Sequence, residues 1–149
     1  MKLAEALQER ADLSTRIDQL RARLSANATV QEGEKPAEDP MVLLKELDEC
    51  LKTQEKLIAD INLTNSKTKV EGKTLTELLA QRDSLTLKIA CYRSLLNDAS
   101  LLAQRATRTE IKIMSAVNVP DLQKQVDKMS KELRKVDNII QETNWNTML

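Results

Sequence analysis

The chain has 149 residues, of which 31% are charged and 41% hydrophobic, with 23 basic and 23 acidic side chains, two cysteines and no histidine. Such a balanced charge argues against a nucleic-acid binder, which needs a basic face to displace counterions. Without histidine, a Cys–His pair and a Ser–His–Asp triad are both excluded, and two lone cysteines do not have zinc-ligand spacing. We therefore expect a protein that is not an enzyme and has no cofactor, metal or nucleic-acid partner.

The composition also limits the architecture and the location. Aromatic residues make up 1% of the chain, so the core must be aliphatic, which is typical of helical bundles. The length suits a single helical domain over residues 1–149. The N-terminal segment is charged from Lys2 onward and does not resemble a secretory signal. No segment approaches the ~18 apolar residues of a spanning helix. We expect a cytoplasmic protein that does not bind membranes.

Apolar residues spaced by three and four positions predict four long helices, over residues 2–26, 40–69, 75–106 and 120–143. The first stripe comprises Leu3, Ala6, Leu13, Ile17, Leu20 and Leu24, with Arg10 in register. The second comprises Leu44, Leu47, Leu51, Ile58 and Ile61, with Gln54 between them. The third comprises Leu75, Leu78, Leu85, Ile89, Tyr92, Leu96, Ala99, Ala103 and Ala106, interrupted by Arg82. The fourth comprises Leu122, Val126, Met129, Leu133, Val136 and Ile140.

Local signals support these helix boundaries. Asp39 followed by Pro40 is typical of a helix start, and Thr74 with Glu77 has the spacing of a capping box. Residues 70–73 contain Gly72 and predict a short turn between antiparallel second and third helices. The sequence therefore predicts an all-α protein of long antiparallel helices, as a four-helix bundle or a coiled-coil-like arrangement.

Two connecting segments interrupt the helical pattern. Apolar residues alternate with polar ones across 109–117, which favours a strand, and a strand needs a partner. The best candidate for that partner is 29–34, in the acidic connection between the first two helices. We predict a small two-stranded ribbon formed by 29–34 and 109–117.

Several helices carry apolar residues beyond one face. These residues are Leu7 in the first helix, Leu43, Cys50 and Leu57 in the second, and Leu79, Leu87, Leu95 and Leu101 in the third. A second apolar face needs another helix or another subunit to cover it. We expect a homo-oligomer, a dimer or larger, or a complex with a protein partner. Both cysteines, Cys50 and Cys91, adjoin stripe residues and are expected to be small buried hydrophobes.

Asn62, Asn65 and Arg82 are the polar residues that stand out, because the short turn after the second helix brings them within plausible reach of one another. Arg82 occupies a stripe position where leucine is expected. The favoured interpretation is a structural polar layer that sets register, and the alternative is an anion-binding pocket. The acidic connection, with Glu32, Glu34, Glu38 and Asp39, gives a further hypothesis of cation binding.

Five blocks along the chain resemble a known family. They are VQEGEKPAEDP at Val30–Pro40, INLTN at Ile61–Asn65, TLTELLAQRD at Thr74–Asp83, TEIKI at Thr109–Ile113 and KELRKVDNIIQETNW at Lys131–Trp145. The chain is similar to uncharacterised small bacterial proteins that are sometimes labelled septicolysin or viral A-type inclusion protein. This resemblance implies an all-helical fold without an established activity.

The sequence thus supports one leading hypothesis and two alternatives. The leading hypothesis is a non-enzymatic helical protein that acts through self-association or protein–protein interaction. The first alternative, implied by the septicolysin label alone, is a membrane-active, pore-forming protein. The second is a small-ligand or cation site at the loop end.

Overall fold

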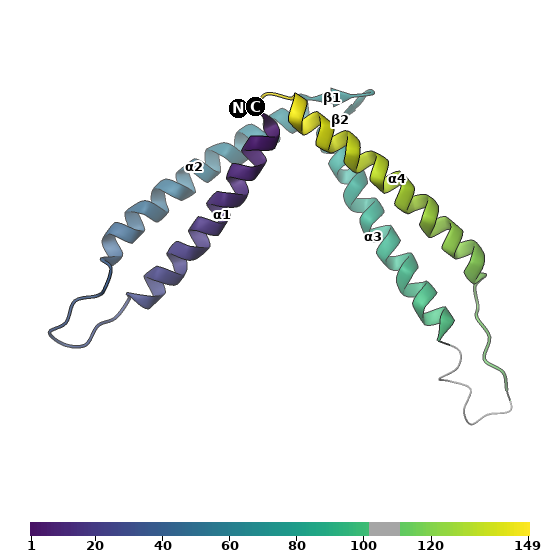
Figure 1. The fold of residues 1–149 in the computed structure, drawn as a ribbon, viewed down its shortest axis with the longest axis horizontal. Helices are drawn as coiled ribbons and strands as arrows, with labels where there is room; N and C mark the ends of the chain where they lie inside the picture. Colours follow the sequence, from purple (N-terminus) through teal and green to yellow (C-terminus); the bar gives the residue numbers. More distant parts are fainter. Residues whose placement is uncertain (102–110) are drawn as a thin grey trace. The chain divides into compact units, whose positions relative to one another are not determined.

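The structure is a computed structural model that describes residues 1–101 and 111–149 (Figure 1). Its described helices are α1 (Leu3–Ala26), α2 (Pro40–Lys67), α3 (Leu75–Ser100) and α4 (Val119–Asn146). Two short strands, β1 (Lys69–Val70) and β2 (Lys73–Thr74), lie between α2 and α3. The prediction of an all-α protein with four long helices is confirmed. The expected continuation of the third helix over 102–106 falls outside the described residues.

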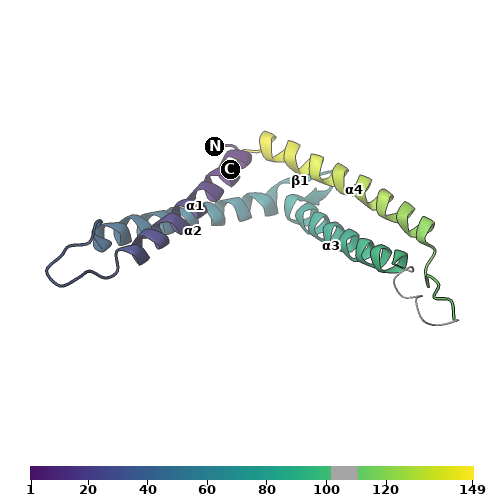
Figure 2. The same cartoon turned by 60° about the horizontal axis from the view of Figure 1, so that its bottom comes forward.

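The chain divides into two compact units, which we describe separately. Unit 1 comprises Met1–Thr74 and Thr143–Leu149, and unit 2 comprises Leu75–Glu142. In unit 1, α1 and α2 lie side by side as an antiparallel hairpin, and in unit 2, α3 and α4 do the same (Figures 1 and 2). The predicted single domain depends on how these units associate and stays a prediction.

The core of unit 1 lies between α1 and α2. Leu20, Leu43 and Cys50 are buried there, and partly buried aliphatic residues surround them: Leu13, Ile17, Leu24 and Leu47. The predicted stripe of α1 is therefore correct, because its members are buried or half-buried along the whole helix. Burying a leucine is worth about 1.5–3 kcal/mol, so this aliphatic seam stabilises the hairpin.

The predicted stripe of α2 is wrong in its phase. Leu43, Cys50 and Leu57 face the core, whereas Leu44, Leu51 and Ile58 are 40%, 44% and 37% exposed. The predicted and the observed stripe share residues 47, 54 and 61 and both alternate in threes and fours, so spacing alone does not choose between them. The choice is made by packing against α1.

The core of unit 2 is a second aliphatic seam. Ile89 and Leu96 of α3 pack with Val126 and Met129 of α4. Tyr92, Val119, Leu122 and Leu133 lie against this cluster. The predicted stripes of both helices are confirmed for the residues that the structure describes. α4 is the most strongly amphipathic of the helices, which explains why its heptad spacing is legible from the sequence.

Side chains define two of the helix starts. The backbone N–H of Met41 donates to Asp39 Oδ1 at 3.0 Å, so Asp39 caps α2 and Pro40 occupies its first position, as predicted. The N–H of Asp121 donates to Asn118 Oδ1 at 3.2 Å at the start of α4.

The start of α1 is completed by the C-terminal residues of the same unit. The N–H of Leu3 donates to the carbonyl of Thr147 at 2.9 Å, and that of Leu149 to the carbonyl of Met1 at 2.9 Å. The Lys2 ammonium lies 5.9 Å from the centre of the Trp145 ring. These contacts provide an acceptor for one of the free amides at the first turn of α1.

The predicted ribbon is in the wrong place. The described residues of 29–34 and 111–117 form no strand, and residues 109–110 lie outside the described range. Within 29–34, Gly33 has a φ of +85° and the N–H of Glu34 donates to the carbonyl of Gln31 at 3.0 Å. This local turn opposes extended pairing.

The ribbon that forms instead joins β1 to β2, with Lys69 opposite Thr74 and Val70 opposite Lys73. Its two-residue turn, Glu71–Gly72, has φ angles of 51° and 83°. Two positive φ angles suit the twist of a tight hairpin.

The phase of α2 yields a direct test with a pair of neighbouring leucines. Leu43→Ala should destabilise the protein by about 2–5 kcal/mol, because it leaves a cavity in the seam. Leu44→Ala removes a side chain that is 40% exposed and should cost less than ~1 kcal/mol. Urea unfolding followed by circular dichroism measures both changes. Equal losses, or a larger loss at Leu44, would contradict the observed phase.

Candidate functional site

An exposed apolar row runs along α2. It consists of Leu44, Leu51 and Ile58, which we call the α2 row. Its members are seven residues apart and therefore lie on one face of the helix. All three side chains are exposed although they were predicted to be buried. Apolar side chains that share a face mark an interaction surface more clearly than scattered ones do.

A second exposed row runs along α3. It consists of Leu87, Cys91 and Leu95, which we call the α3 row, spaced by four residues. Leu87 is 67% exposed and Leu95 is 45% exposed. The expectation of two buried cysteines is confirmed for Cys50 and wrong for Cys91, which is an exposed free thiol. Leu87 and Leu95 were expected to lie outside the main stripe, and the structure places them there.

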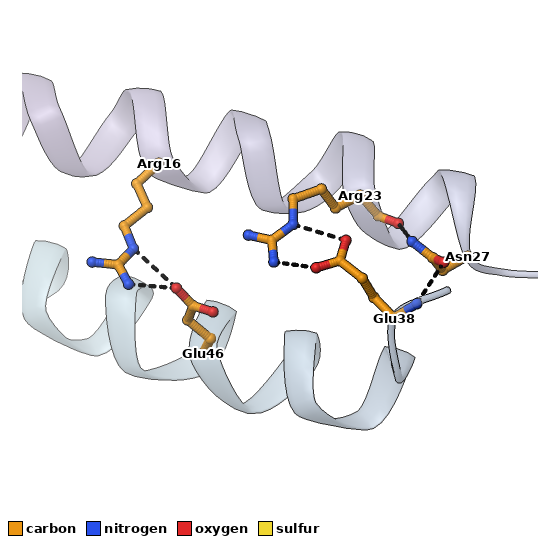
Figure 3. A network of polar contacts seen from close by, with 5 residues as sticks. All are labelled: Arg16, Arg23, Asn27, Glu38 and Glu46. Carbon is orange, nitrogen blue, oxygen red and sulfur yellow. Dashed lines mark hydrogen bonds and ion pairs between the residues drawn. The ribbon is translucent and has the colours of Figure 1, made fainter. Parts of the chain in front are cut away.

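A polar clamp links α1 to α2 and to the connection that precedes α2 (Figure 3). Arg16 donates from Nε to Glu46 Oε1 at 3.1 Å and also contacts that oxygen through Nη2. Arg23 donates from Nε to Glu38 Oε2 at 3.0 Å and from Nη2 to Glu38 Oε1, which is a two-bond arrangement. These pairs were not predicted from the sequence. Their signal is the position of Arg16 and Arg23, seven residues apart beside an apolar seam.

Asn27 closes the base of the connection between α1 and α2. Its Nδ2 donates to the carbonyl of Arg23 at 2.8 Å, and its Oδ1 accepts from the N–H of Glu38 at 3.0 Å. Asn27 is buried, and both bonds satisfy groups that would otherwise lose contact with water. The clamp therefore fixes where the connection leaves α1 and where it enters α2.

The ion pairs perturb the groups that form them. The hydrogen bond to Arg23 lowers the pKa of Glu38 from its ordinary value of 4.5. The hydrogen bonds to Glu46 and Glu38 raise the pKa values of Arg16 and Arg23, respectively. Both arginines stay charged at any ordinary pH. The four side chains are partly exposed to solvent, so each pair contributes little net stability and mainly sets geometry.

Two shallow clefts lie within unit 1. One, of about 220 Å³, adjoins the clamp and is lined by Arg16, Glu46, Cys50 and their neighbours Leu13, Glu49 and Thr53. The other, of about 470 Å³, lies at the end of α2 and is lined by Asp60, Leu63, Thr64, Lys67, Thr68, Met148 and Leu149.

The residues of the predicted polar layer lie in different units. Asn62 and Asn65 belong to α2 in unit 1, where Asn62 is exposed and Asn65 is half-buried. Arg82 belongs to α3 in unit 2 and donates from Nε and Nη2 to its neighbour Asp83, each at 3.2 Å. A shared layer of Asn62, Asn65 and Arg82 stays a prediction.

The acidic connection uses two of its four acids for other contacts. Glu38 pairs with Arg23, and Asp39 caps α2. Across residues 1–101 and 111–149, no three His, Cys, Asp or Glu side chains are grouped so as to hold a metal ion. Over the same residues, no helix is long and apolar enough to cross a bilayer.

The fold and the exposed rows define a class of protein built from amphipathic helical hairpins. The chain belongs to DUF6847, a family of unknown function, whose model matches residues 10–149. It is similar to the crystal structure of a functionally unknown conserved protein from Corynebacterium diphtheriae. The identity is 38% and the TM-score is 0.92, over 99% of this chain and 97% of the other. No curated protein matches the chain. These comparisons support an uncharacterised family, and they support neither the septicolysin nor the inclusion-protein label.

The depressed pKa of Glu38 predicts how stability depends on pH. The charged carboxylate is favoured in the folded state, so its contribution is present above about pH 4.5 and is lost as pH falls through the lower folded pKa. Glu38→Gln should therefore lower the melting temperature at pH 7, with a difference from the wild type that shrinks as pH falls below about 4.5.

Thermal unfolding between pH 2.5 and 7 measures this difference. Glu32→Gln is the matched control, because Glu32 lies in the same connection and forms no salt bridge with the described residues. A Glu38→Gln difference that persists unchanged at pH 3 would show that the Arg23 contact does not favour the charged carboxylate.

Proposed function

We propose that this protein is non-enzymatic and acts in the cytoplasm through association of its helical faces, with a second copy of itself as the partner of the α3 row. The observation that supports this proposal is the exposure of Leu87 and Leu95 on one face of a long helix. Exposed apolar side chains that gather on one face mark protein–protein interaction sites more often than singly scattered ones do.

The order of residues along the α3 row suits two-fold pairing. Ser84 precedes Leu87 by three positions and Asp98 follows Leu95 by three, so the pattern reads polar, leucine, cysteine, leucine, polar in both directions. In an antiparallel pair with Cys91 on the two-fold axis, Leu87 of one copy meets Leu95 of the other. Ser84 then lies near Asp98 of the other copy, where its hydroxyl can donate to the carboxylate. Such a self-complementary surface is what a symmetric dimer requires.

The double substitution Leu87→Glu with Leu95→Glu tests this pairing. Each leucine buried at an interface contributes about 1.5–3 kcal/mol, so losing two from each copy should weaken the dimer by at least about a hundredfold. Light scattering coupled to gel filtration, over a concentration series, should show a dimer for the wild type and a monomer for the variant. Val42→Glu, at an exposed apolar residue outside both rows, is the control and should remain a dimer.

Cys91 provides an independent proximity measurement. A short bismaleimide should cross-link two wild-type copies, Cys91→Ser should abolish the cross-link, and Cys50→Ser should preserve it, because Cys50 is buried. A wild-type protein that is monomeric at every concentration and does not cross-link would reject self-association through α3.

A further inference from the structure

We propose that the α2 row is a docking site for an amphipathic helix of another protein, one that carries lysine or arginine residues beside its own apolar row. This inference goes beyond self-association, because it concerns a different surface and a different class of partner. It rests on side chains of α2 alone, so it stands or falls separately from pairing through α3.

Acidic residues alternate with the apolar members of the α2 row. Asp48 lies four residues after Leu44 and three before Leu51, and Glu55 has the same relation to Leu51 and Ile58. This alternation of threes and fours is the seam of a coiled coil, with one position aliphatic and the other acidic. All five side chains are exposed, so the seam is complete and accessible on the free helix.

The two carboxylates of this seam are not neutralised in the structure. Neither Asp48 nor Glu55 forms a salt bridge with any of the residues that the structure describes. Lys52 follows Asp48 by one helical turn, yet the two are not within ion-pair distance. A helix that brings basic groups opposite Asp48 and Glu55 therefore gains charge complementarity together with apolar burial.

A second copy of this chain fits the α2 row poorly. If two α2 rows pair with each other, the acids of one copy meet the acids of the other, and like charges across an interface are costly. The α3 row is the other exposed apolar row on the described helices, and it is followed by Asp98. The partner is thus a helix with the opposite charge pattern.

The same charges disfavour a membrane as the occupant. Helices that lie on a membrane surface carry lysine and arginine on their polar face, because the cytoplasmic leaflet is anionic. On the α2 row the side chains that alternate with the leucines are carboxylates. Lys45, Lys52 and Lys56 lie on α2 beside this row, but the positions between its apolar residues are acidic, so a basic amphipathic helix matches the row better than an anionic lipid surface does.

Two designed peptides test the proposal. Both are 21-residue helices (about three heptads) with leucine in an apolar row, and they differ only in carrying lysine or glutamate beside that row. Binding of fluorescent peptides to the full chain is followed by anisotropy at low and high salt. The wild type should prefer the lysine peptide by at least about tenfold, and salt should weaken that preference because it screens exposed charges.

Charge reversal on α2 should invert this preference. Asp48→Lys with Glu55→Lys should bind the glutamate peptide more tightly than the lysine peptide, and Leu51→Lys should weaken both. The control, Asp127→Lys with Glu132→Lys on α4, makes the same change in net charge on exposed residues elsewhere and should keep the wild-type preference. Circular dichroism establishes that each variant is folded.

Failure of either proposal is recognisable separately. Equal binding of the two peptides by the wild type, or no binding of either, would overturn the inference even if light scattering shows a dimer. A wild-type monomer that binds the lysine peptide selectively would retain the α2 docking site and reject self-association through α3. An unchanged preference after charge reversal would show that the peptide binds at another surface.

Discussion

The constraint on which this structure depends is that two helices in a hairpin cover only one face of each other. With 1% aromatic residues, the seam of each hairpin is a single line of aliphatic side chains, such as Leu20 against Leu43 and Cys50. An apolar residue off that line stays in contact with water until something else covers it. On the described helices the exposed large apolar side chains lie on α2 and α3, apart from Trp145 on α4.

The helices were predictable because their signals are local and redundant. Asp39 with Pro40 defines the start of α2, and the heptad spacing of α4 survives in the structure without a shift. The phase of α2 was not predictable, because Leu43 and Leu44 continue two equally regular patterns around the shared residue Leu47. Periodicity identifies a helix with a wide apolar face. Which part of that face is buried depends on how the partner helix packs, and the spacing of apolar residues carries no information about the partner helix.

The ribbon and the polar clamp show that pairing between residues far apart in the sequence is also hard to predict from the sequence. Alternation near Ile111 and Ile113 favours a strand, but a strand needs a partner. The expected partner segment contains a local turn at Gly33, whose φ is +85°. The observed ribbon joins β1 to β2 through the two turn residues Glu71 and Gly72. This signal is local, and from the sequence it predicts a turn without specifying a hairpin. The Arg23–Glu38 contact joins residues on either side of a connection. It could not be predicted from the sequence, because it depends on how the connection brings α1 and α2 together.

The two apolar rows differ in a way that net charge conceals. The chain as a whole is neutral at pH 7, yet the α2 row is interrupted by Asp48 and Glu55 while the centre of the α3 row is an uncharged cysteine. An uncharged, symmetric row such as the α3 row is suited to pairing with an identical row. An acidic row such as the α2 row repels an identical row and favours a basic one. This difference is the basis of our proposal that one hairpin pairs with a second copy and the other binds a different protein. This difference between the two rows depends on the phase of α2. If the buried face of α2 were shifted by one residue, Asp48 and Glu55 would be buried against α1.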